Sequence, residues 1–215
     1  MKHPKPRNGF ALPTLMVVLA LASMATLLAM RNLWVNEQLL NAEADQLRTQ
    51  HKVEAVLPVA LADILSTATN NDGTTNLRHA IGHATQTHAF FPNTLTEYDV
   101  LRQRLGTNIC SLGICAPHAL NANATKASYW KSQTGSSMQV SAAYTPYGDN
   151  TAWYWIEVFP QNGTSTTSIP PFTYRITVMA KGVMPGSITL LQAIWARNID
   201  TTLTGQWQSW HVLHD

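Results

Sequence analysis

The stretch FALPTLMVVLALASMATLLAM, residues Phe10 to Met30, decides the architecture of this chain. It carries no charged residue, and at a rise of about 1.5 Å per residue its helix spans the roughly 30 Å hydrocarbon core of a bilayer. Three cations lie in residues 1–9 ahead of it, and the first acidic residue is Glu37. This pattern predicts one membrane helix with a cytoplasmic N-terminus, so that the rest of the chain crosses the membrane.

The overall composition limits what the rest of the chain can be. Of its 215 residues 45% are hydrophobic and 12% are charged, about half the usual charged share of a soluble domain. A mean hydropathy of −0.08 excludes a protein with many membrane spans. Without the three cations of the leader, 11 Lys and Arg oppose 12 Asp and Glu. We therefore expect no nucleic acid partner.

The helical pattern continues beyond the membrane segment. After Arg31 neither glycine nor proline occurs until Pro58, and a leucine recurs every seven residues, at Leu33, Leu40 and Leu47. The sequence therefore predicts an amphipathic extension of the helix over residues 31–65. Pro58 is expected either to kink or end this helix or to lie within it, with the end at Leu65.

Residues 66–215 are expected to form an extracytoplasmic head. The segment TLTEYDVLRQRLG predicts a helix with one apolar face, formed by Leu95, Tyr98, Leu101 and Leu105. Period-two patterns then predict an antiparallel sheet of about four strands in SSMQVSAAYT, TAWYWIEVFP, FTYRITVMAKG and SITLLQAIWARN, with WQSWHVL as a possible fifth. A long helix packed on such a sheet gives an α+β roll.

The aromatic run in TAWYWIEVFP invites two interpretations. Trp153 and Trp155 share one face of a strand and Tyr154 lies on the other. We expect the Trp pair to be buried against the long helix, and the alternative is a platform for sugar or peptide. The loop from Gln161 to Pro171 is a further candidate for outward contact.

Cys110 and Cys115 are the only cysteines. In an oxidising compartment this pair is most simply a disulfide, and closing so small a loop contributes about 2 kcal/mol in the chain-entropy model. A catalytic or metal-binding thiol pair is the rival, although the pair lacks the C-x-x-C spacing.

The remaining motifs give little support to catalysis. His79, His83 and His88 form H-x3-H-x4-H, a weak metal pattern because no H-E-x-x-H arrangement accompanies it. No nucleophile elbow, phosphate-binding loop or dinucleotide fingerprint is present. We therefore expect no enzyme, no metal and no cofactor.

A resemblance to a known family rests on both ends of the chain. A basic leader ending in Gly9, followed by Phe10 and an apolar helix, is similar to type IV prepilins, which implies cleavage after Gly9 and methylation of Phe10. The closest likeness is to PilX-type minor pilins. The segments ICSLGIC, WYWIEVFP and YRITVMAKGVMPGSITLLQAIWARN resemble that family's cysteine loop and last strands.

The resemblance implies a pilin-like roll whose N-terminal helix assembles with other subunits. The implied assembly residues are Pro13, Thr14, Leu15 and Leu19. It further implies an inner-membrane subunit with a periplasmic head that primes pilus assembly and enters the pilus at or near its tip. The implied partners are other minor pilins, the major pilin, the prepilin peptidase, the assembly platform and a large tip adhesin.

One position departs from the family pattern. Most pilins carry a glutamate at the fifth mature position, where this chain has Thr14. The carboxylate is thought to pair with the N-terminal amine of a neighbouring subunit, because an unpaired charge in lipid is costly. Thr14 cannot form that ion pair, so the departure favours a place at the tip or start of a filament over repeated incorporation along the shaft.

Several alternatives remain open. A minor pseudopilin of type II secretion also fits the missing glutamate. A plain signal anchor fits the apolar length alone, and a cleaved secretory signal fits the small residues Ala20, Ala22 and Ala25. From another class, a signal-anchored periplasmic enzyme or metal-binding protein would use the three histidines.

Overall fold

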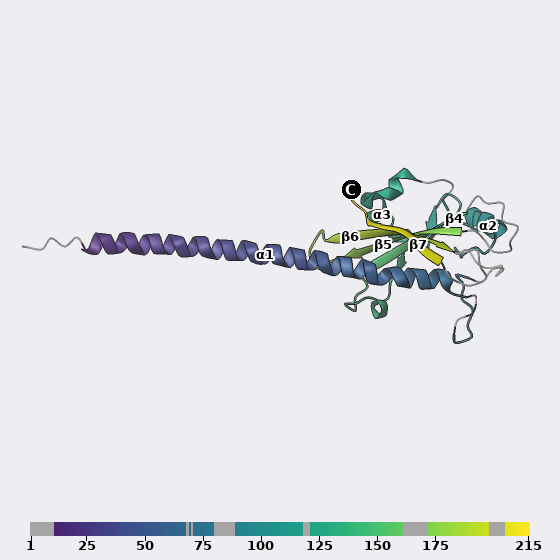
Figure 1. Ribbon diagram of the computed structural model, residues 1–215, viewed down its shortest axis with the longest axis horizontal. Helices are drawn as coiled ribbons and strands as arrows, with labels where there is room; N and C mark the ends of the chain where they lie inside the picture. The colour runs from purple at the N-terminus through teal and green to yellow at the C-terminus, as the bar shows by residue number, and fades with distance from the viewer. Residues whose placement is uncertain are drawn as a thin grey trace, which may run out of the picture. The chain divides into compact units, whose positions relative to one another are not determined.

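The computed structural model describes residues 11–67, 69, 71–79, 89–117, 121–160, 172–197 and 205–215 (Figure 1). The chain divides into two compact units, Met1–Ala44 and Asp45–Asp215. Helix α1 (Ala11–Leu65) supplies the described part of the first unit and the first element of the second.

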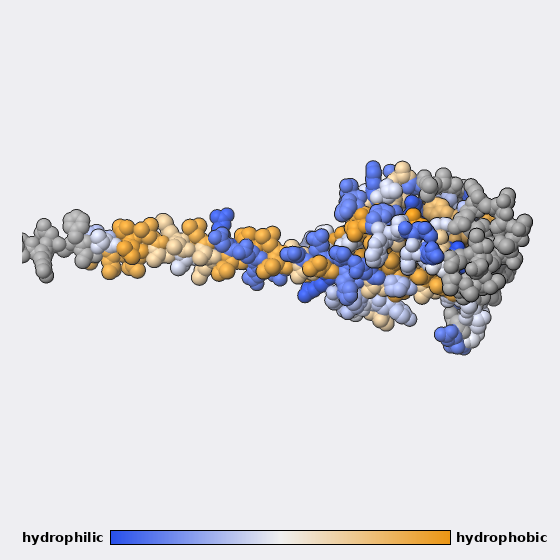
Figure 2. All heavy atoms as spheres, viewed as in Figure 1, coloured by the Kyte–Doolittle hydropathy of each residue, from blue (hydrophilic) through white to orange (hydrophobic). Residues whose placement is uncertain are grey.

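In the first unit α1 exposes its apolar side chains on every side. Leucine, methionine and valine side chains from Leu12 to Met30 are all more than half exposed, and Figure 2 shows this stretch as a nearly unbroken hydrophobic surface. Within the described residues it is the one segment long and apolar enough to cross a membrane. A helix that is apolar all round needs lipid or other helices around it.

The second unit is built on a seven-stranded sheet. Its strands are β1 (Cys110–Ser111), β2 (Ile114–Cys115), β3 (Met138–Gln139), β4 (Ala152–Pro160), β5 (Phe172–Lys181), β6 (Ile188–Arg197) and β7 (Gly205–Val212). Their order is β1-β2-β4-β5-β6-β7, with β3 also pairing with β4. All pairs are antiparallel except β2 with β4. The predicted α+β fold is confirmed, and the possible fifth strand WQSWHVL forms β7.

Residues of α1 beyond Asp45 pack on one face of this sheet. The helix contributes Val53, Val56, Leu57, Ala60 and Ile64 to a core shared with strands β4, β5 and β6. Pro58 lies on the exposed side, and the helix continues past it to Leu65. Pro58 has no backbone N–H to donate, but the hydrogen bond is lost on the solvent side of the helix, where water can replace it. The proline therefore does not end the helix.

Helix α2 (Leu95–Leu105) closes one end of the same core. Thr94 and Glu97 form a capping box at its N-terminus, which fixes where the helix begins. Tyr98, Leu101 and Leu105 are buried as the sequence predicts, whereas Leu95 is exposed.

The opposite face of the sheet has a core of its own, and this corrects the expectation for the Trp pair. Trp155 is fully buried there against Trp130 of the short helix α3 (Ala127–Lys131), with ring centroids 5.1 Å apart. Trp153 packs against that second core as well, while Tyr154 faces α1. Alternation along the strand is confirmed, but the Trp pair lies away from the long helix because the sheet is covered on both faces.

The strand expected in SSMQVSAAYT shrinks to β3. Met138 and Gln139 pair with Tyr154 and Trp153, after which the 3-10 helix η3 (Ala142–Tyr144) carries the chain away. Strand β2 pairs with the same edge of β4 at Ile156. Because two short strands share this edge, neither extends along it. Two further 3-10 helices, η1 (Ala122–Thr125) and η2 (Thr134–Ser136), lie in this part of the chain.

Candidate functional site

The first part of the candidate site is the apolar segment of α1. Gly9 and Phe10, the implied processing residues, lie outside the described residues. The implied assembly residues lie exposed in the first three turns of α1, namely Pro13, Thr14, Leu15 and Leu19. Pro13 stands in the first turn, where a backbone N–H has no partner within the helix, so it fits there at little cost.

The polar side chains of this segment bond within the helix. Ser23 donates its hydroxyl to the Leu19 carbonyl (2.7 Å), and Thr26 donates to the Ser23 carbonyl (2.8 Å). In lipid an unsatisfied hydroxyl is costly, and these local bonds avoid that cost. The segment therefore suits a hydrocarbon environment in its polar residues as well as in its apolar ones.

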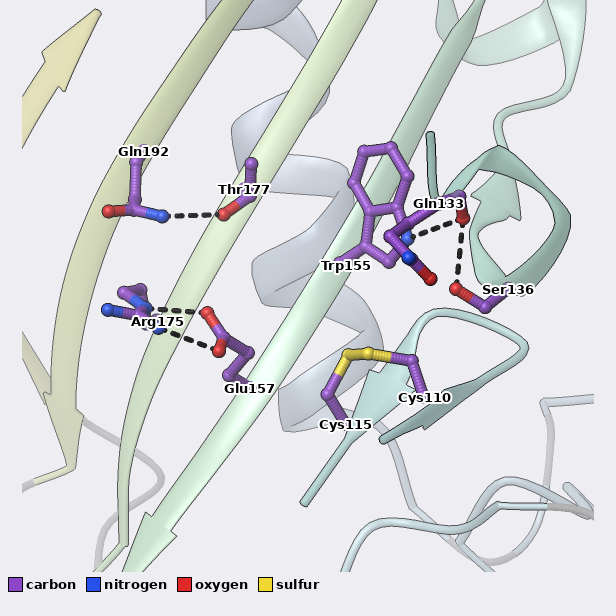
Figure 3. Close-up of a disulfide and its surroundings, with 9 residues drawn as sticks. All are labelled: Cys110, Cys115, Gln133, Ser136, Trp155, Glu157, Arg175, Thr177 and Gln192. Atoms are coloured by element: carbon purple, nitrogen blue, oxygen red, sulfur yellow. Dashed lines mark hydrogen bonds and ion pairs between the residues drawn. A yellow bond between two sulfur atoms is a disulfide. The ribbon is translucent and has the colours of Figure 1, made fainter. Parts of the chain in front are cut away.

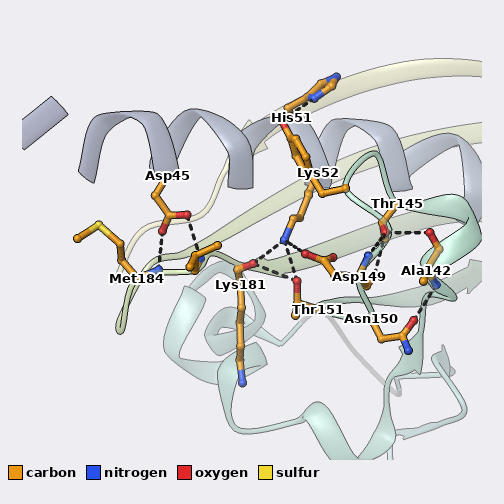
Figure 4. A network of polar contacts seen from close by, with 12 residues as sticks. Asp45, His51, Lys52, Ala142, Thr145, Asp149, Asn150, Thr151, Lys181 and Met184 are labelled. Carbon is orange, nitrogen blue, oxygen red and sulfur yellow. Dashed lines mark hydrogen bonds and ion pairs between the residues drawn. The ribbon is translucent and has the colours of Figure 1, made fainter. Parts of the chain in front are cut away.

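The second part is a polar stripe on α1, which we define as Asp45, Thr49 and Lys52. Figure 4 shows Asp45 and Lys52 pointing from the helix toward the sheet. All three side chains are buried against the sheet, one turn apart along the helix. Asp45 accepts hydrogen bonds from the N–H groups of Val183 (2.9 Å) and Met184 (3.0 Å) in the β5–β6 turn. Burial raises the pKa of Asp45, but these backbone bonds outweigh burial and hold that pKa below its ordinary value.

Lys52 makes the densest set of polar contacts in the stripe. Its ammonium donates to Asp149 (2.5 Å), to the Thr151 hydroxyl (2.8 Å) and to the Lys181 carbonyl (3.0 Å). Thr49 lies one turn earlier and shares a hydrogen bond with Thr189 of β6 (2.8 Å). The stripe thus fixes where α1 lies along the sheet. Apolar contacts alone would fix this position less precisely, because they are not directional.

This stripe was not predicted from the sequence, although a signal for it is present there. Asp45, Thr49 and Lys52 stand at positions i, i+4 and i+7, which share one helix face. That face continues into the buried apolar residues that follow Lys52. Polar residues in line with an apolar face point to buried polar contacts.

The last turn of α1 is joined to the head by Asp63. Its carboxylate accepts three hydrogen bonds from the Arg78 guanidinium (3.0, 3.1 and 2.6 Å) and one from the Tyr154 hydroxyl (2.8 Å). Arg78 also donates to the carbonyl of Leu112 (2.6 Å). Arg78 thereby links the end of the long helix to the hairpin that carries the cysteines.

That hairpin consists of β1 and β2 closed by a disulfide between Cys110 and Cys115 (Figure 3). Leu112 and Gly113 form its turn with φ values of 48° and 77°. Gly113 is required there, because a Cβ would meet the backbone of Met138 and of Tyr154. The structure therefore agrees with the disulfide interpretation and gives the pair a structural place at the sheet edge.

A buried ion pair lies beside the hairpin in Figure 3. Arg175 of β5 donates to both carboxylate oxygens of Glu157 of β4, at 2.5 and 2.7 Å. Glu157 is 2% exposed. Burial raises its pKa, and the bonds and charge of Arg175 only partly oppose that rise.

Of the three histidines in the candidate metal pattern, the structure describes His79. His79 is buried, stacks on Phe91 (centroids 4.8 Å apart) and contacts the Asp63 carbonyl through Nε2 (2.6 Å). Burial lowers the pKa of His79, which keeps the ring neutral. His83, His88 and the loop from Gln161 to Pro171 lie outside the described residues. Within the described ranges no group of three or more His, Cys, Asp or Glu could hold a metal ion.

Comparison with known proteins finds a match to one family model. Residues 111–197 match the PilX model, described as type IV pilus assembly protein PilX C-term. The match begins in the cysteine hairpin and ends with β6, so it covers the ion pair and most of the sheet. No curated protein and no solved structure matches the chain.

Proposed function

We propose that the chain, which matches the PilX family over residues 111–197, is a minor pilin of a type IV pilus that helps to initiate pilus assembly and lies at or near the pilus tip. The observation that carries the proposal is the joint presence of an uncharged, mainly apolar stretch of α1 from Leu12 to Met30 and a head that matches the PilX family over residues 111–197. The first element supports membrane anchorage, and the second supports the type of filament.

The proposal includes a maturation step. Prepilin peptidase cuts between Gly9 and Phe10, and Phe10 becomes the methylated N-terminus. Before assembly residues 10–30 hold the chain in the inner membrane, with its N-terminus in the cytoplasm and its head in the periplasm. The cations of residues 1–9 support this orientation. During assembly Leu15, Leu19 and their neighbours exchange lipid for helix contacts.

The tip location follows from the chemistry of Thr14. A threonine cannot neutralise the N-terminal amine of a neighbouring subunit within the apolar filament core. A subunit at the tip has no subunit ahead of it, so it has no such amine to neutralise. The partners in this proposal are other minor pilins, the major pilin, the inner-membrane assembly platform and a large tip adhesin. The chain acts as an assembly subunit and not as an enzyme.

Mass spectrometry of the N-terminal peptide, from membrane-extracted protein, tests the maturation step. We expect a chain that begins at Phe10 and is heavier by one methyl group. Gly9→Leu should leave the leader attached and abolish pili, whereas the neighbouring change Asn8→Ala should permit cleavage. An intact Met1 in the native chain, or a cut near Ala25, would refute the maturation step.

A second pair of variants tests the tip location. Thr14→Glu supplies the missing carboxylate and should raise the amount of this chain per major pilin in sheared pili several-fold. Thr14→Gln has a similar size without the charge and should leave that ratio unchanged. An equal ratio for native chain and Thr14→Glu would show that Thr14 does not restrict the chain to the tip.

A further inference from the structure

Among the described residues, β7 forms the outer edge of the sheet. β7 stands last in the strand order, and β6 is its one strand neighbour among the described residues. Its sequence GQWQSWHV contains no Lys, Arg, Asp, Glu or Pro, which are the residues that usually guard an edge against pairing with another chain. Eight residues long, β7 is long enough to pair with a full strand.

Backbone groups on this edge point away from the sheet. Leu213 donates its N–H to the Leu190 carbonyl (2.9 Å), which marks these two residues as a hydrogen-bonded pair. In an antiparallel ladder such pairs alternate, so the N–H and C=O groups of Trp210 and Val212 point outward. Within the part of the chain that the structure describes, these groups have no backbone partner, so they can pair with an added strand.

A bulge places two tryptophans on the same side of this edge. The register shifts between Ile194 and Trp195, so that Ser209 pairs with the first and Trp207 with the second. Without the bulge at Gln208, Trp207 and Trp210 would face opposite sides of the strand. With it both lie on the face that carries α1, and they are 45% and 67% exposed.

The two tryptophans form one wall of a groove. Leu57, Pro58 and Leu61 of α1 form the other wall, and the groove volume is ≈540 Å³. It has room for apolar side chains from an added strand. Partly exposed tryptophans beside such a space are the side chains that most often dominate the binding energy of protein interfaces.

One charge at the groove selects the chemistry of the occupant. Glu54 of α1 is the one ionisable side chain among the described residues that line it, and its carboxylate accepts a hydrogen bond from the neutral amide of Gln50 (3.1 Å). A lysine or arginine on the incoming strand would pair with Glu54 and pack over a tryptophan ring. A second copy of β7 brings no such cation, because β7 contains none.

We propose that β7 and this groove bind an extended segment of a partner protein, which adds a strand to β7 and carries apolar side chains and a cation toward the groove. The segment pairs with the backbone of Trp210 and Val212, its apolar side chains fill the space beside Trp207, and its cation meets Glu54. The inference rests on the geometry of the head and is independent of processing at Gly9.

Peptide binding to the full chain in detergent micelles tests this proposal. The probe is the labelled octapeptide KTLTVTLT, which presents Lys, Leu and Val on one face of a strand, and fluorescence anisotropy reports binding. Two further versions are N-methylated on alternate amides, one on the Thr residues and one on the others. In an added strand only every second amide faces β7. Strand addition therefore requires that one methylated version bind about tenfold or more weakly than the unmethylated peptide, while the other binds about as well as it does.

Variants of the chain locate the binding site. Trp210→Ala should weaken binding about tenfold or more, whereas Trp34→Ala, which removes a tryptophan that is 61% exposed elsewhere on α1, should have no effect. The peptide ETLTVTLT should bind several-fold more weakly than KTLTVTLT, and Glu54→Gln should remove that difference.

Each of the opposite results would overturn the proposal. No saturable binding of KTLTVTLT at millimolar concentration excludes a strand-binding edge, and equal binding of both N-methylated versions excludes backbone pairing. A dimer of the full chain that Trp210→Ala dissociates would assign the groove to a second copy. A brominated detergent could also quench the tryptophan fluorescence of the chain. If Trp210→Ala reduces this quenching and the peptide does not relieve it in the native chain, the groove would be assigned to lipid.

Discussion

Replacing Arg175 by methionine would isolate the cost of one buried carboxylate in the head. Methionine keeps much of the apolar stem of Arg175 but removes both hydrogen bonds to Glu157. Glu157 is 2% exposed, so water cannot replace the lost partner without disturbing the core. Breaking a buried pair from one side costs about 3–5 kcal/mol, and we expect Arg175→Met to fall in that range at pH 7.

The expected change is large enough for thermal unfolding of the full chain in detergent, followed by tryptophan fluorescence. For a head of this size each kcal/mol lowers the Tm by about 2–4 °C, so Arg175→Met should lower it by about 6–20 °C. The matched control replaces both partners, Glu157→Leu with Arg175→Met. Because no charge remains buried, the double variant should lie within about 2 kcal/mol of the native chain.

The pH dependence provides a second check. Burial raises the pKa of Glu157 in the folded state, and loss of Arg175 raises it further. The folded variant then holds a proton that the unfolded chain releases near the ordinary glutamate pKa of about 4.3. Its stability should therefore recover as the pH falls from 7 to 5. A cost that is equal at both pH values, or a double variant as unstable as Arg175→Met, would refute the reasoning.

Two further predictions concern the helix contact and the sheet edge. Lys52→Met should destabilise the head by about 2–3 kcal/mol at pH 7, less than Arg175→Met, because Asp149 is 34% exposed and can be rehydrated. Burial raises the pKa of Asp149, but the hydrogen bonds from Lys52 and Thr151 and the charge of Lys52 outweigh burial and hold that pKa low. The stability that this carboxylate contributes is present above its unfolded pKa of about 3.9 and is lost as the pH falls through its folded pKa. Because Lys52→Met removes part of this contribution, acid titration of unfolding should show a shallower loss of stability in the variant. Gly205→Ala forces a Cβ into the ring of Trp195 and should cost about 1–3 kcal/mol in urea unfolding. Gly135→Ala, with no atom within 4 Å of the added Cβ, should change the midpoint little, and equal effects of the two would contradict the clash.

The long helix and α2 could be predicted from the sequence because their signals are local. An uncharged apolar run followed by a helical period defines α1, and a capping box ahead of an apolar face defines α2. The sheet was predictable for the same reason in β4, β5 and β6, whose nine or ten residues are rich in aromatic and β-branched side chains. A two-residue strand such as β3 has no period to detect.

Contacts between distant segments were not predictable. Alternation shows that Trp153 and Trp155 share a face, but only the position of Trp130 on α3 shows which face that is. Asp63 meets Arg78 and Tyr154 through the fold and not through any spacing in the sequence. The groove beside β7 depends on a bulge, which leaves no mark in the sequence pattern.

The polar stripe of α1 has a mechanical consequence. Asp45, Thr49 and Lys52 connect the helix to the β5–β6 turn, to β6 and to the end of β5. A pull along the axis of α1 strains these connections at the same time, in shear, and does not peel them apart one after another. Bonds loaded together share the force, so the head resists tension along its helix better than a sideways pull that would detach the helix from the sheet.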